Sequence, residues 1–105
     1  MRFVETPAFT SALRRHLDDE AYRALQVSLW LRAEQGAIIP GGRGLRKLRW
    51  RADGRGKRGG VRVIYYWSLP DDTCLMVYLY AKNEQGDLTR EQLRLLAQLA
   101  REEFR

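Results

Sequence analysis

The side chains best suited to chemistry in this sequence are cations, and they are concentrated in one short stretch. Nine lysines and arginines lie between residues 43 and 62 against a single acid, Asp53, so these 20 residues carry +8 while the other 85 carry −2. A concentration of one sign creates a directed electric field, and a polyphosphate is its usual partner. The stretch therefore predicts a nucleic-acid-binding surface, and a basic segment that only confers solubility remains the alternative.

Within this stretch the cations follow the period of a strand. In residues 45–51 (LRKLRWR), Lys47 and Arg49 alternate with Leu48 and Trp50, which is typical of a strand with one basic and one apolar face. We expect this basic face to lie beside cations from the following loop and two later strands, where tyrosines share the same faces. The residues expected to converge are Arg49, Lys57, Arg58, Arg62 and Lys82.

RNA suits such a site because it carries its own nucleophile, the 2′-hydroxyl group. Cations hold phosphate oxygens, and tyrosine rings can stack on bases. An enzyme that removes the 2′-hydroxyl proton and stabilises the extra charge at phosphorus needs no metal. A lysine crowded by cations could be the base, and another cation could neutralise the departing 5′-oxygen. Two other interpretations stay open: the tyrosines belong to the core, and the arginines only hold phosphate.

Other kinds of active site have little support in the sequence. His16 is the only histidine and lies beside two arginines, which predicts a surface residue, and Cys74 in an apolar strand predicts a buried side chain. Neither a zinc-binding cluster nor the spacing of a phosphate-binding loop is present, so no metal or cofactor is expected. The single cysteine, the absence of a signal pattern and the short apolar runs together predict a soluble cytoplasmic protein.

The order of the predicted elements is β-α-α-β-β-β-α, in one domain spanning residues 1–105. This is an α+β fold in which an antiparallel sheet packs on helices, with one face covered by them and the other free for function. Predicted strands occupy Arg2–Glu5, Leu45–Arg51, Val61–Ser68 and Cys74–Lys82. Predicted helices run from Pro7 to about His16, from Asp18 or Asp19 to Gly36, and from about Asp87 onward. The second helix is expected to bury Tyr22, Leu25, Val27, Leu29, Trp30 and Ala33.

Two segments resemble a known family. Residues 44–67 (GLRKLRWRADGRGKRGGVRVIYYW) and residues 80–89 (YAKNEQGDLT) are similar to HigB-type toxins of the RelE superfamily. The resemblance is close from Gly44 onward and loose before it. Any one of GLRK, GKRGG, RVIYY and YAKNE would be weak alone, but the four in this order are specific.

The resemblance implies the toxin of a type II toxin–antitoxin pair, which enters the ribosomal A site and cleaves messenger RNA without a metal. It also implies a cognate antitoxin, usually a HigA-like helix-turn-helix protein. The positions that match the superfamily's catalytic residues are Lys47 or Arg49, Lys57, Arg62 and Lys82. Additional candidate RNA contacts are Arg46, Arg51, Arg55, Arg58, Tyr66 and Tyr80.

One departure concerns proton transfer. Some relatives carry a tyrosine or histidine near the C-terminus, whereas this chain has Phe104, which cannot transfer a proton. Other members of the superfamily keep the fold without activity. The alternative prediction is therefore a non-catalytic module of the same fold that binds RNA, the ribosome or the antitoxin.

Overall fold

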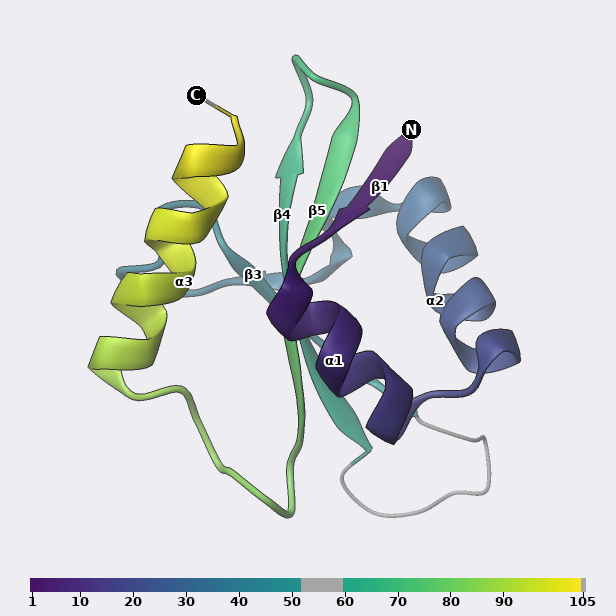
Figure 1. Cartoon of the computed structure of the whole chain (residues 1–105). Helices are drawn as coiled ribbons and strands as arrows, with labels where there is room; N and C mark the ends of the chain where they lie inside the picture. Colours follow the sequence, from purple (N-terminus) through teal and green to yellow (C-terminus); the bar gives the residue numbers. More distant parts are fainter. Residues whose placement is uncertain (52–59, 105) are drawn as a thin grey trace.

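A computed structural model shows a five-stranded sheet with helices on both faces (Figure 1), and it describes residues 1–51 and 60–104. The elements are β1 (Arg2–Glu5), α1 (Pro7–His16), α2 (Asp19–Leu31), the 3-10 turn η1 (Ala33–Gln35), β2 (Ala37–Ile38), β3 (Arg46–Trp50), β4 (Val61–Ser68), β5 (Thr73–Ala81) and α3 (Arg90–Glu103). The order of strands across the sheet is β1-β5-β4-β3-β2. The α+β class is confirmed.

Two details of the sheet differ from the predicted antiparallel arrangement. Strand β1 pairs in parallel with β5, with Arg2 opposite Thr73, so the sheet is mixed. Parallel pairing is possible here because most of the chain separates the two strands, which is enough for a crossover. The second difference is the two-residue strand β2, which pairs with the start of β3 and is too short to show a period of two.

The helices begin at the capping residues that the sequence indicates. The Thr6 hydroxyl accepts the Phe9 N–H at 3.0 Å, and Pro7 is the first residue of α1. Asp18 caps α2, and a capping box between Thr89 and Gln92 begins α3. Helix α3 begins at Arg90, three residues after its predicted start at about Asp87, whereas α1 has the predicted bounds.

The helices divide between the two faces of the sheet. Helices α1 and α2 pack on one face, where Phe9, Leu25 and Leu29 join the buried side chains of β4 and β5. Helix α3 packs on the opposite face through residues such as Leu96 and Ala97. The face expected to be free for function is therefore covered over part of its area by α3.

Helix α2 buries a narrower stripe than the sequence predicts. Leu25 and Leu29 are fully buried, but Val27 and Trp30 are exposed, the latter at 64%. The buried contact runs along the i, i+4 row of Leu25 and Leu29. Val27, two positions from each leucine, and Trp30, one position after Leu29, therefore turn away from the sheet. Helix α2 also ends at Leu31, and η1 carries the chain to Gly36.

The predicted degree of burial is confirmed for the single cysteine but not for the single histidine. Cys74 is buried as predicted, and burial raises the pKa of its thiol to about 12. The prediction of a surface histidine is wrong, because the His16 side chain is only 13% exposed and its Nε2 lies 3.4 Å from Glu84 Oε1. The loop before α3 thus covers the end of α1.

Among the described residues, no helix combines the length and apolar character needed to cross a membrane.

Candidate active site

The centre of the candidate site is a row of side chains that crosses three strands. On β3 and β4, Arg49 is paired with Arg62, and on β4 and β5, Arg62 is paired with Tyr80. Directly opposed residues of antiparallel strands project from the same face of the sheet. The guanidinium groups of Arg49 and Arg62 and the ring of Tyr80 therefore belong to one face, the one on which α3 packs.

A second row lies next to the first. Lys47 is paired with Ile64, and Ile64 with Tyr78. Ile64 and Tyr80 belong to the core beneath α3, whereas Tyr78 is half-buried. Helix α3 thus covers the middle of this face and leaves the end near Arg49 open, because Arg49 itself is exposed.

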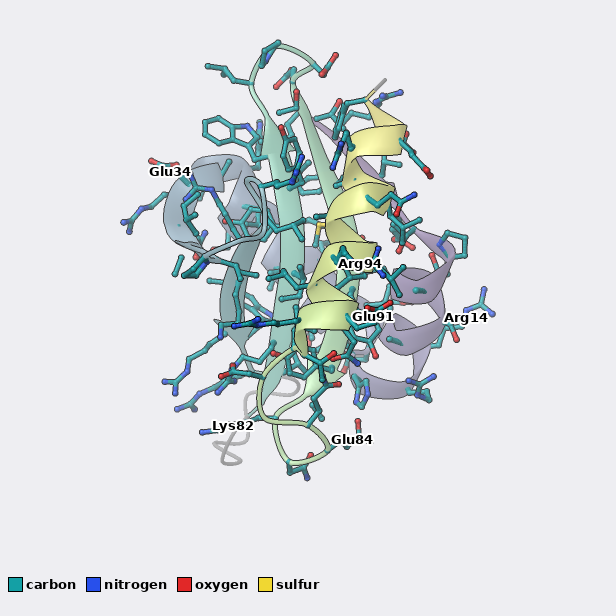
Figure 2. All side chains as sticks on the ribbon, turned by 90° about the vertical axis from the view of Figure 1, so that its left-hand side faces the viewer. Arg14, Glu34, Lys82, Glu84, Glu91 and Arg94 are labelled. Carbon is teal, nitrogen blue, oxygen red and sulfur yellow. The ribbon has the colours of Figure 1, made fainter. Side chains whose placement is uncertain are left out.

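Lys82 lies at this same end of the sheet. It directly follows β5, its side chain is exposed, and its N–H donates to the Gly60 carbonyl at 3.3 Å. This bond places Lys82 beside the start of β4, of which Arg62 is the second residue. Figure 2 shows Lys82 at the lower end of the sheet, below α3.

Arg62 is the most buried of the candidate-site cations that the structure describes. It is 7% exposed, so the rest of the protein holds its guanidinium in a fixed place. An arginine keeps its charge when buried, and its planar group can bind two phosphate oxygens at once. Fixed positive charge of this kind stabilises an anionic transition state without reorganisation.

An acid from the loop before α3 completes the site. Lys47 Nζ lies 3.0 Å from Asp87 Oδ1, a hydrogen-bonded ion pair between residues forty positions apart. Asp87 is exposed, and its negative charge also acts on Tyr80. Sequence reasoning missed this role, since Asp87 was interpreted only as the start of the last helix. Its side chain is free for the ion pair because Thr89 makes the cap.

Tyr80 lies beneath the open end of the site. Its ring is 3% exposed, and its hydroxyl is buried without a hydrogen-bond partner among the described residues. Burial raises the pKa of this hydroxyl, the charge of Asp87 raises it further, and Arg62 lowers it. The phenol therefore stays protonated at neutral pH, and a base cannot stack on the ring as it is placed.

Comparison with known families shows which family has this sequence and fold. The sequence matches the family described as the RelE toxin of the RelE/RelB toxin–antitoxin system, over residues 1–105. The chain belongs to the RelE toxin family. It is accordingly a toxin of a toxin–antitoxin system, with an antitoxin as its partner.

Two of the RNA-contact candidates predicted from the sequence, Arg46 and Tyr66, lie away from the candidate site. Arg46 projects from the other face, where its Nη1 donates to the carbonyl oxygens of Glu34 and Gly36, each at 2.9 Å. Tyr66 shares the face of Arg62 but lies toward the far end of β4, and its ring centroid is 5.3 Å from that of Phe104.

The remaining candidate residues from the sequence lie in the basic loop between β3 and β4 or directly beside it. Arg51 is exposed directly after β3, one alternation beyond Arg49. Lys57, Arg55 and Arg58 lie outside the described residues. The site that the structure describes is thus formed by Lys47, Arg49, Arg62, Lys82 and Asp87, with Tyr78 and Tyr80 beneath it.

Proposed function

We propose that this RelE-family toxin is a HigB-type endoribonuclease that cleaves messenger RNA in the ribosomal A site without a metal. The observation that carries the proposal is the row formed by Arg49, Arg62 and Tyr80, with Lys47 in the next row. Two cations held side by side on a rigid sheet suit a phosphodiester, whose two non-bridging oxygens share one negative charge.

The reaction that this arrangement supports is an internal transfer at phosphorus. The 2′-oxygen attacks the adjacent phosphorus and loses its proton, while the bond from phosphorus to the 5′-oxygen breaks. The products are a 2′,3′-cyclic phosphate and a strand with a 5′-hydroxyl, whose oxygen receives a proton. Arg62 and Arg49 stabilise the additional charge on the phosphoryl oxygens, the largest electrostatic demand of the step.

Three of the described side chains can accept or donate the protons of this reaction. Asp87 can accept the 2′-hydroxyl proton as a carboxylate, or Lys47 can accept it as an amine once Asp87 is displaced from it. Lys82 is exposed at the end of β5 and can donate a proton toward the 5′-oxygen. Lys57 is a further candidate from the basic loop. Variants of these residues separate the roles through the pH profile of cleavage.

The proposal includes the cellular setting. The partner would be a HigA-like antitoxin with a helix-turn-helix domain, the substrate a message bound to the ribosome, and the compartment the cytoplasm. An overall excess of six positive charges favours association with the polyanionic ribosome.

Induced expression followed by primer extension on a translated message tests this function. The wild type should arrest growth and create new 5′ ends within codons, whereas Arg62→Ala and Lys82→Ala should give neither. Because Arg62 is buried, its variant must first show a cooperative thermal transition. The charge-matched control is Arg14→Ala, at an exposed position of α1. RNA binding without any cut ends in the wild type would instead establish a non-catalytic module.

A further inference from the structure

A second basic feature lies outside the candidate active site, along one side of α3. A groove of about 720 Å³ runs between this helix and the segment that joins β2 to β3. Its charged lining consists of Arg43 from that segment, three arginines of α3 and one glutamate, which together give a formal charge of +3. The α3 residues are Arg90, Arg94, Arg101 and Glu102.

The three helix arginines lie along one side of α3, because their spacings of four and seven residues are close to one and two helical turns. At 1.5 Å per residue, Arg94 is about 6 Å and Arg101 about 16 Å along the helix from Arg90. All three are exposed. Arg94 pairs with Glu91 at 2.6 Å on the same helix (Figure 2). An exposed i, i+3 pair contributes little, so Arg94 can exchange this acid for another anion.

Both walls of the groove include residues that lie close in the chain to the candidate active site. Arg90 follows Asp87 by three residues, and Asp87 is bound to Lys47. At the other wall, Arg43 lies four residues before Lys47 in the chain. A chain of anions could therefore pass from the Lys47 row directly into the groove.

We propose that this groove binds the sugar–phosphate backbone of the RNA strand next to the cleaved bond. The inference rests on the proposed function, which it extends from the reacting nucleotides to their neighbours. Single-stranded nucleic acid is commonly held by a positively charged groove that follows its backbone. Each guanidinium group can bind a phosphate through two parallel hydrogen bonds.

An acidic protein segment is the competing occupant, and the lining favours it less. The apolar residues of the floor are Leu93 and Ala97, and both already contact the core beneath α3. Ala97 is only 6% exposed. A docked helix would gain little apolar burial there, although a buried apolar centre provides most of the energy of protein interfaces.

Binding of RNA that cannot be cleaved tests the groove separately from catalysis. The probes are a single-stranded 20-nucleotide RNA and a trinucleotide, both 2′-O-methylated to block the nucleophile. The test variant is Arg90→Gln/Arg94→Gln/Arg101→Gln. The control is Arg14→Gln/Arg15→Gln/Arg23→Gln, which removes the same charge from exposed positions of α1 and α2. Figure 2 shows Arg14 on the side of the molecule away from Lys82.

The expected readout is the salt dependence of affinity. Each lost phosphate contact should flatten the slope of log K against log salt by about 0.7, so the groove variant should be shallower than the control by about 2 for the long probe. The trinucleotide, which reaches only the Lys47 row, should bind both variants alike. If the triple variant does not give a cooperative melt, Arg101→Gln alone should flatten the slope by about 0.7.

Equal slopes for the groove variant and its control would overturn the inference. If the slopes are equal and the groove variant alone loses binding to poly-glutamate, the inference is also overturned, and the groove is assigned to an acidic protein segment. The proposed function has a separate failure: a wild type that binds the long probe through the groove but never cuts a translated message.

Discussion

Asp87 holds the amine of Lys47 at 3.0 Å, so the candidate active site of this toxin contains an acid beside its cations. The pair joins the loop before α3 to β3 across the open end of the sheet. Both groups lie near the surface, Asp87 especially, so the pair competes with water and with any phosphate that approaches.

Replacing this acid should strengthen RNA binding without weakening the fold. In Asp87→Asn, Lys47 loses its competing anion, and the affinity for a 2′-O-methylated RNA should rise several-fold. The free energy of unfolding should change by less than about 1 kcal/mol, since an exposed ion pair contributes no more than that. Fluorescence anisotropy and urea denaturation measure the two quantities.

Glu34→Gln on η1 is the matched control, because it removes one exposed acid at the end of the molecule away from Lys82 (Figure 2). If Asp87 is also the base, Asp87→Asn should bind RNA tightly and cleave it slowly. A variant with unchanged affinity and unchanged cleavage would show that Asp87 has neither role.

The hydroxyl group of Tyr80 should be dispensable for stability. It is buried without a partner among the described residues, so Tyr80→Phe removes a desolvated polar group and should leave the free energy of unfolding unchanged or higher. Tyr65→Phe is the contrast, since the Tyr65 hydroxyl donates to the Ala33 carbonyl at 2.6 Å and accepts the Gly36 N–H at 2.8 Å.

That second variant should lose about 1 to 3 kcal/mol, because it leaves two buried backbone groups unsatisfied. Urea unfolding of both variants gives the comparison. A large loss in Tyr80→Phe would mean that its hydroxyl binds a group beyond those described, and would place it closer to the chemistry.

The thiol of Cys74 should make stability fall at alkaline pH. Its pKa is raised by burial from 9.0 to about 12 in the folded protein. Above pH 9 the unfolded chain loses this proton while the folded chain keeps it, so stability falls as pH rises toward 12, with a limiting slope of about 1.4 kcal/mol per pH unit.

Chemical denaturation between pH 8 and pH 10 measures this effect before most tyrosines titrate. Cys74→Ala should start less stable, because it leaves a small cavity, and should lose less stability across the same interval. Parallel curves for the two proteins would assign the alkaline loss to other groups.

Alternation along the strands was sufficient to predict which side chains project from the same face of the sheet. Lys47 and Arg49 project with Arg62, and Val61–Ser68 is the strand that the sequence predicted. The same alternation places Arg46 with Leu48 on the opposite face. The sequence alone therefore indicated that Arg46 does not project with Lys47 and Arg49.

Other features depend on contacts that no local pattern contains. The Lys47–Asp87 pair spans forty residues, and the burial of His16 results from a loop near Glu84. Tyr80 alternates with the site residues, but α3 reaches far enough along the sheet to bury its ring. The position of α3 over the face is a tertiary property, and it decides which predicted contacts remain accessible.

Arg46 and Arg49 offer the sharpest test of the two faces, since they are three residues apart and project in opposite directions. Arg49→Ala removes an exposed guanidinium group from the row with Arg62, and cleavage should fall by about 100-fold with little change in stability. Arg46→Ala leaves the carbonyl oxygens of Glu34 and Gly36 without their donor, and should cost about 1 to 3 kcal/mol of stability.

At a temperature where both variants are folded, Arg46→Ala should cleave a translated message within a few-fold of the wild-type rate. Thermal melts and primer extension on the same preparations give both readouts. The opposite result, with cleavage lost in Arg46→Ala and kept in Arg49→Ala, would move the active site to the α1–α2 face. Because the sheet register fixes both side chains, an intermediate result in which the two variants lose cleavage equally would contradict the assignment as well.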